Sequence, residues 1–145
     1  MTEGRIRALF IKSDRKNRRV SVPSALAIKD GFHGDYHSTP RSRRQILLVS
    51  GAVLDELELE PGALSENVTV DGIDVMQFKE GQRLQLGDAM VEVTRACERC
   101  THLERIKSGL GDAVLQRRGV FVRVTSPGPV RVGDRVQFTC STMTA

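Results

Sequence analysis

The sequence predicts an all-β protein, a closed or partly closed β-barrel with a few short helices. Apolar residues occur in short runs with a period near two, and Gly, Pro, Asp and Asn separate these runs. A sheet made of such hairpins closes most readily into a barrel, because closure removes exposed strand edges. Strands are predicted at residues 5–12, 45–49, 83–86, 90–94, 120–124 and 135–139.

Two short helices are expected between these strands. Ser50 can cap a helix over residues 51–57, whose valine and leucine residues share one face. A second helix is expected after Cys100, where leucine and isoleucine recur at spacings of three and four.

Two Gly-Asp pairs are expected to be hairpin turns. Gly87-Asp88 and Gly133-Asp134 lie in segments of similar sequence, each of which is typical of a strand, a turn and a second strand. Glycine tolerates the positive φ of tight turns, and aspartate can bond to its own backbone there.

Length and composition indicate one soluble domain over residues 1–145. The chain is 39% hydrophobic and 28% charged, values that suit a globular protein. Because no apolar run reaches the roughly 20 residues of a membrane helix, no membrane association is expected. The three cysteines are an odd number and the N-terminus lacks a secretory pattern, so we expect reduced thiols and a cytoplasmic location.

The chain is basic, with a net charge of +4 and arginines concentrated at residues 15–19 and 41–44. Such clusters attract anions. Nucleic acid is disfavoured as a partner because the chain has no Trp and only one Tyr to stack on bases. A phosphate-bearing small molecule or cofactor fits this charge, and so does simple solvation of the loops.

The segment Cys97-Glu-Arg-Cys100-Thr-His102 carries the most reactive side chains. A structural zinc site would need four ligands, and the chain offers no second paired motif. A dithiol redox pair would need a strand-to-helix setting that the all-β pattern does not provide. Cys100 acting alone as a thiolate, or lying buried and inert, remains open.

Several features favour a thiolate at Cys100. Arg99 is adjacent, Arg95 is close in sequence, and the helix expected from Thr101 would present its positive end. A thiolate is a good ligand for a soft metal and a good nucleophile.

Two further clusters could contribute to a site. Residues 31–37, followed by Arg44 and Gln45 at a strand start, could cradle an anion with backbone amides and guanidinium groups. Residues 65–72 place Glu66 and Asn67 just before a strand-like run. Both clusters also suit ordinary turns.

In this order, the clusters resemble the MOSC domain, found at the C-terminus of molybdenum-cofactor sulfurases and in stand-alone bacterial proteins. Gly31-Phe-His-Gly34-Asp35-Tyr-His37 and Arg44-Gln45 are similar to its early Gly-Asp-x-His and Arg-Gln motifs. Ser65-Glu66-Asn67 is similar to its Gly-Glu-Asn segment, with Ser65 where the family often has Gly. Cys100 aligns with the family's single expected cysteine.

The resemblance implies a β-barrel that binds molybdenum cofactor (molybdopterin) or carries sulfur on Cys100, and related proteins reduce N-hydroxylated compounds. Cys100 would be the catalytic residue and metal ligand. Implied partners are a small-molecule cofactor or substrate and an electron-transfer or sulfurase protein. The alternative is a non-catalytic binding module whose basic surface engages an acidic partner or nucleic acid. The expected cofactor-binding residues are Gly34, Asp35, His37, Arg44, Gln45, Glu66 and Asn67.

Overall fold

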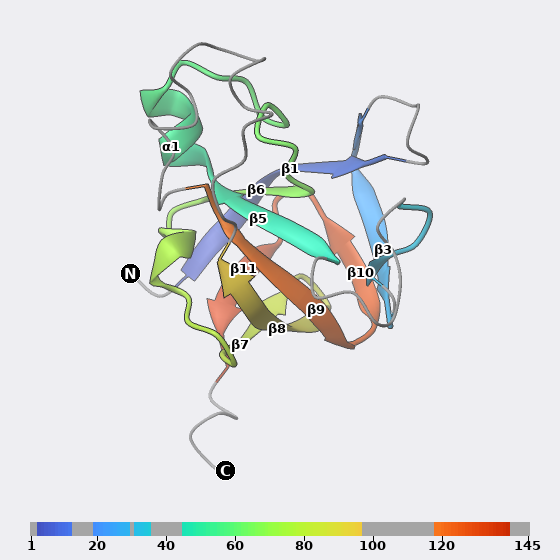
Figure 1. Ribbon diagram of the computed structural model, residues 1–145. Helices are drawn as coiled ribbons and strands as arrows, with labels where there is room; N and C mark the ends of the chain where they lie inside the picture. Colours follow the sequence, from blue (N-terminus) through green and yellow to red (C-terminus); the bar gives the residue numbers. More distant parts are fainter. Residues whose placement is uncertain (1–2, 13–18, 30, 36–44, 97–117, 140–145) are drawn as a thin grey trace.

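The computed structural model describes residues 3–12, 19–29, 31–35, 45–96 and 118–139, and the structural statements below concern these residues. They form eleven strands, one α-helix and one 3-10 helix (Figure 1). In chain order the elements are β1 (Glu3–Ile11), β2 (Val20–Val22), β3 (Ser24–Ile28), β4 (Gly31–Phe32), β5 (Ile46–Ser50), α1 (Gly51–Glu56), β6 (Val68–Asp71), η1 (Val75–Gln77), β7 (Arg83–Leu86), β8 (Ala89–Ala96), β9 (Val120–Ser126), β10 (Gly128–Arg131) and β11 (Arg135–Phe138).

Seven of these strands close into a barrel, as the sequence predicts. The order is β11-β7-β8-β9-β5-β6-β1, and β1 pairs back with β11 to complete the ring. All neighbours in the ring are antiparallel except β5 and β6. Strand β2 extends the sheet beyond β1, and β10, β3 and β4 form a small second sheet.

The barrel interior holds the main apolar core. Ile46 and Leu48 of β5 face inward and are opposite Val122 and Val120 of β9, and all four belong to this core. Leu47 and Val49 alternate with them and pack outside the barrel in a second cluster with residues of α1 and the following loop. Strand β5 is therefore buried on both faces, which explains its continuous apolar sequence.

The helix at residues 51–57 is confirmed, but its predicted cap is wrong. Ser50 precedes α1 without making a side-chain cap, and its hydroxyl instead accepts a hydrogen bond from the Val75 amide at 2.9 Å. Ser50 thus joins β5 to η1, because its side chain points away from the helix amides. The helix expected after Cys100 lies outside the described residues.

Only one of the two predicted hairpins is confirmed. The turn at Gly87-Asp88 joins β7 and β8, which pair directly. The turn at Gly133-Asp134 joins β10 and β11, which separate because β10 pairs with β3 and β11 with β7 and β1. Its local geometry is as expected: Gly133 has φ of 94°, and Asp134 Oδ2 accepts from the Arg131 amide at 2.8 Å.

No helix in the described part of the chain is long and apolar enough to span a membrane.

Candidate functional site

Asn67 joins three segments of the chain at the start of β6. Its side chain accepts from the Leu47 amide at 3.1 Å and donates to the Phe10 carbonyl at 3.2 Å and to Asp35 Oδ1 at 3.4 Å. The same Asp35 oxygen accepts from the Lys12 amide at 2.9 Å. Both side chains are buried. The structure therefore brings Asp35 and Asn67 into direct contact, where they tie β1, β5 and the end of the 31–35 segment together.

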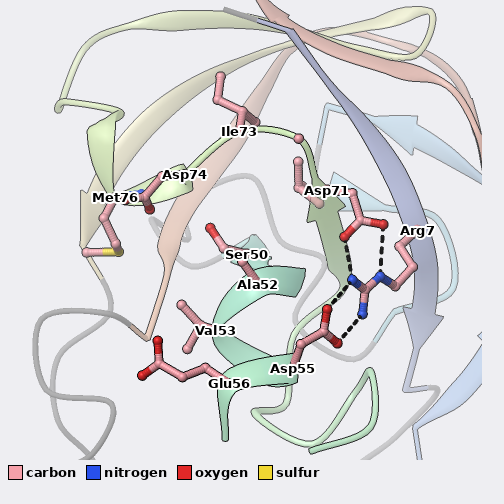
Figure 2. Close-up of a pocket in the computed structure, with 12 residues that line it drawn as sticks. Arg7, Ser50, Ala52, Val53, Asp55, Glu56, Asp71, Ile73, Asp74 and Met76 are labelled. Carbon is pink, nitrogen blue, oxygen red and sulfur yellow. Dashed lines mark hydrogen bonds and ion pairs between the residues drawn. The ribbon is translucent and has the colours of Figure 1, made fainter. Parts of the chain in front are cut away.

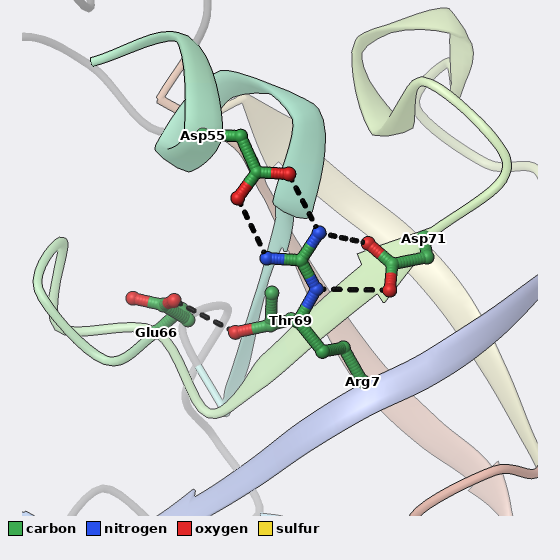
Figure 3. Close-up of polar contacts among 5 residues, drawn as sticks. All are labelled: Arg7, Asp55, Glu66, Thr69 and Asp71. Carbon is green, nitrogen blue, oxygen red and sulfur yellow. Dashed lines mark hydrogen bonds and ion pairs between the residues drawn. The ribbon is translucent and has the colours of Figure 1, made fainter. Parts of the chain in front are cut away.

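Glu66 is fully buried and its carboxylate is occupied by internal donors. Oε1 accepts from the Leu64 amide at 3.1 Å, while Oε2 accepts from the Gly62 amide and the Thr69 hydroxyl, both at 2.8 Å. Figure 3 shows Thr69 reaching Glu66 across the start of β6. These bonds shape the loop between α1 and β6, since a buried carboxylate must be hydrogen-bonded to be tolerated.

Ser65, next to Glu66, takes a left-handed backbone conformation with φ of 65°. Glycine reaches this region without a steric penalty, whereas a residue with a Cβ is strained by roughly 1–2 kcal/mol. Ser65 therefore stands at a strained turn, at the position where the resemblance described above leads us to expect glycine.

Two cations act beside these carboxylates: Arg118 is buried and Arg19 is partly buried. Arg118 Nη2 donates to the Leu64 carbonyl at 3.0 Å, but its Nε is buried without a hydrogen-bond partner among the described residues. Arg19 Nη1 is in the same condition. Burial lowers the pKa of Arg19, the charges of Asp35 and Glu66 oppose this shift, and the like charge of Arg118 adds to it. The charges of Asp35, Glu66 and Arg118 therefore all act on Arg19.

Two further predicted site residues, Gln45 and Gly34, lie in other surroundings. The Gln45 side chain is buried, accepts from the Val124 amide at 3.0 Å and donates to the Lys29 carbonyl at 3.4 Å. It lines a basic cavity of about 420 Å³ that includes Arg83 and Arg123. Gly34 is an exposed turn residue with φ of 87° and open space where a Cβ would project.

A second cavity, of about 580 Å³, lies beside α1 and contains none of the predicted site residues (Figure 2). Arg7 projects into it from β1 between Asp55 and Asp71, and both carboxylates bond to its guanidinium (Figures 2 and 3). The hydrogen bonds that Arg7 donates to Asp55 and Asp71 raise the pKa of Arg7. Its donors are used within the protein, so this group is a structural clamp between β1, α1 and β6.

The remaining predicted site residues, His37, Arg44 and Cys100, lie outside the described residues, as do Cys97 and His102. In the described part of the chain, no group of three or more His, Cys, Asp or Glu side chains could hold a metal ion. The metal ligand role of Cys100 therefore stays a prediction, and so does the zinc alternative.

Comparison with known proteins decides the family. A family model of the MOSC domain matches residues 35–137, which is more than two thirds of the chain. The chain belongs to the MOSC domain family. A search of curated proteins found no match.

Solved structures share the MOSC fold of this chain. YuaD from Bacillus subtilis superposes with a TM-score of 0.79 at 21% identity, covering 94% of this chain and 95% of YuaD. YiiM from Geobacillus stearothermophilus has a TM-score of 0.74 at 19% identity, covering 94% and 75%. YiiM from Escherichia coli has a TM-score of 0.67 at 17% identity, covering 93% and 69%. At these identities the likeness concerns the fold.

Arg118 of this candidate site is not among the residues predicted from the sequence, and Arg19 is noted there only as part of a basic cluster that attracts anions. Arg19 ends the basic cluster at residues 15–19, where a solvated loop is the usual interpretation. Arg118 stands two residues before β9 in a second basic group. Nothing in the sequence around Arg118 reveals its burial beside Leu64, which belongs to the loop between α1 and β6.

Proposed function

We propose that this MOSC chain binds molybdenum cofactor, with the Cys100 thiolate as the ligand of the metal. The MOSC family is associated with this cofactor. The observation that carries the proposal is the pair of buried donors, Arg118 Nε and Arg19 Nη1, that have no partner among the described residues. A buried donor without a partner costs free energy, and an anionic ligand removes that cost.

The donor set fits a cofactor that bears a phosphate. Guanidinium groups bind phosphate oxygens through charge-assisted hydrogen bonds, and they stay protonated even when buried. Glu66 does not take the place of the phosphate, because its carboxylate accepts hydrogen bonds from residues 62, 64 and 69 and none from the two unpartnered guanidinium atoms. The thiolate of Cys100 complements this anion site, since soft sulfur ligands suit a soft metal.

The described strands support an association between the cysteine segment and Arg118. Strands β8 and β9 are paired up to Ala96 and Val120. The strand ends that flank residues 97–117, the segment that contains Cys100, are therefore neighbours in the barrel. Arg118 is the first described residue after that segment.

When bound, the cofactor would supply a metal centre able to exchange electrons with a substrate. The chain's own residues would hold it: Cys100 at the metal, and Arg19 and Arg118 at the phosphate. Reduction of an N-hydroxylated compound consumes two electrons, so this function also requires an electron-transfer partner protein.

The test is the metal and sulfur content of the full chain purified from cells that make the cofactor. We expect molybdenum in the wild type and in Cys97→Ser, and its loss in Cys100→Ser. Equal molybdenum in all three proteins, or none in any, would overturn the proposal. A persulfide on Cys100 without molybdenum would assign sulfur carriage instead, and stoichiometric zinc lost on chelation would assign a structural metal site.

The non-catalytic alternative has its own signature. Binding to an acidic partner or nucleic acid that falls steeply with salt, ignores Cys100→Ser and depends on Arg41, Arg43 and Arg44 would favour it over cofactor binding.

A further inference from the structure

The cavity beside α1 has no part in the function proposed above. Its volume of about 580 Å³ lies within the roughly 300–1,000 Å³ of pockets that bind small organic ligands. Its lining comes from α1, from the end of β6 and the segment that follows it, and from Arg7 of β1 (Figure 2). None of these residues belongs to the candidate cofactor site, so the cavity is a separate candidate for ligand binding.

One part of the cavity lining is apolar. Val53, Val70 and Ile73 line it and are each more than nine-tenths buried. Met76 also lines it and is half-buried. Its flexible thioether can adapt to apolar groups of different shape. These four side chains form an apolar wall against which the hydrocarbon part of a ligand can pack.

The rest of the lining is acidic, with four carboxylates and one guanidinium. The guanidinium of Arg7 bonds to Asp55 and Asp71 at 2.7–2.9 Å, which leaves this group one net negative charge. On the other side of the cavity in Figure 2, Asp74 accepts from the Met76 amide at 2.9 Å and has no ion pair among the described residues. Because the whole chain carries a charge of +4, this excess of negative charge is local, and it attracts cations to the cavity.

A buried hydroxyl adds a polar group that an acidic surface alone would lack. Ser50 lines the cavity and is only 3% exposed. Its Oγ accepts from the Val75 amide at 2.9 Å, but no described residue accepts the hydroxyl proton. In Figure 2 this oxygen points into the space that the labelled residues enclose. A buried donor without an acceptor costs free energy, so a ligand that supplies an acceptor here is favoured.

We propose that this cavity binds a small organic cation: a protonated amine on an apolar body, with a hydrogen-bond acceptor for the Ser50 proton. The amine would lie among Asp55, Asp71 and Asp74, because an ionised carboxylate has about four acceptor sites and these are only partly used. The apolar body would pack on the apolar wall. The volume suits a small molecule, whereas a stable protein partner needs about 800 Å² of contact on each side.

The experiment titrates the full chain with tyramine, which joins a protonated amine and a phenol oxygen through an aromatic body. Binding is followed by the amide chemical shifts in nuclear magnetic resonance spectra. A probe of this size should bind with a Kd on the order of 1 mM. It should shift the amides of residues 50–56 and 70–76. Tyrosol, the neutral alcohol of the same shape, should bind about tenfold more weakly, because it lacks the charge that the carboxylates attract.

Three variants test the cavity itself. Asp74→Asn keeps an acceptor for the Met76 amide, and it should weaken tyramine about two- to fivefold without changing tyrosol. Asp88→Asn is the matched control: it makes the same change of charge at an exposed turn outside the cavity and should bind tyramine like the wild type. Ala52→Phe, at an exposed position of the lining, should fill the cavity and abolish the binding of both probes.

Four results would each overturn the proposal. They are the absence of tyramine binding, equal affinities for tyramine and tyrosol, shifts confined to residues outside the cavity, and equal effects of Asp74→Asn and Asp88→Asn. Binding of oligolysine at this cavity without binding of tyramine would also overturn it, and would assign the acidic face to a basic protein partner.

Discussion

Replacing Glu66 by Gln should destabilise the barrel strongly, although the side chain changes little in size. The buried carboxylate accepts three hydrogen bonds, from the amides of residues 62 and 64 and from the Thr69 hydroxyl. A glutamine has one acceptor oxygen, and its NH2 group would face at least one of these donors. The substitution also withdraws a negative charge from the vicinity of Arg19.

The size of the effect follows from these contacts. A hydrogen bond to a charged group contributes about 1.5–3 kcal/mol, and a buried donor left unsatisfied costs about 1–3 kcal/mol. Losing one such bond and stranding its donor should lower the free energy of unfolding by about 3 kcal/mol. For a domain of this size, that corresponds to a fall in melting temperature of about 10 °C.

Urea denaturation followed by circular dichroism measures this free energy. Glu60→Gln, at an exposed glutamate of the same loop, is the matched control and should unfold like the wild type. A loss below about 1 kcal/mol for Glu66→Gln would show that the internal hydrogen bonds contribute little. Glu66 would then be better explained as a residue that contacts the cofactor, and its substitution should reduce molybdenum content without changing stability.

Three further predictions concern Asn67, Ser65 and the ion pair of Arg7 with Asp55. Asn67→Ala should lower the free energy of unfolding by about 2–4 kcal/mol in the same urea assay, because it leaves the Leu47 amide buried without an acceptor; an unchanged midpoint would contradict this. Ser65→Gly should raise the melting temperature, by relief of about 1 kcal/mol of left-handed strain, and a lower value would show that Ser65 makes compensating contacts. The hydrogen bond from Arg7 lowers the pKa of Asp55 below 3.8. The contribution of this ion pair to the free energy of unfolding should therefore be present at neutral pH and disappear as the pH falls through that lowered pKa. The free energies of unfolding of Asp55→Asn and wild type should then differ at pH 7 and converge in strong acid. A difference that stays constant with pH would contradict the pairing.

The strands that the sequence predicts are those with large apolar residues on the buried face. Strands β7, β8, β9 and β11 alternate in this way, and their predicted and observed ranges agree within two residues at each end. Strand β3 was missed because its pattern is inverted: Ala25 and Ala27 are buried, while Leu26 is 48% exposed. Small residues against the barrel carry no hydrophobic signal from which a period could be recognised.

For the site too, the sequence identified individual residues but not the groups that surround them. The sequence singled out Asp35, Glu66 and Asn67, and the structure places all three in one buried polar region. Their hydrogen-bond partners are mostly backbone groups of distant segments, which no local pattern specifies. Arg118 was not predicted as a site residue, and Arg19 was noted only within a basic cluster, because an arginine in such a cluster is usually exposed.

The pairing of β1 with β11 sets an order on how this molecule can form during its synthesis. Glu3 lies opposite Gln137, so the ring closes through residues separated by almost the whole described chain. The β1–β11 pairing can therefore form only after the ribosome has synthesised the residues up to β11. Until then β1 presents an unpaired edge, and contacts so remote in sequence form slowly. The nascent chain should thus need protection from aggregation until β11 emerges.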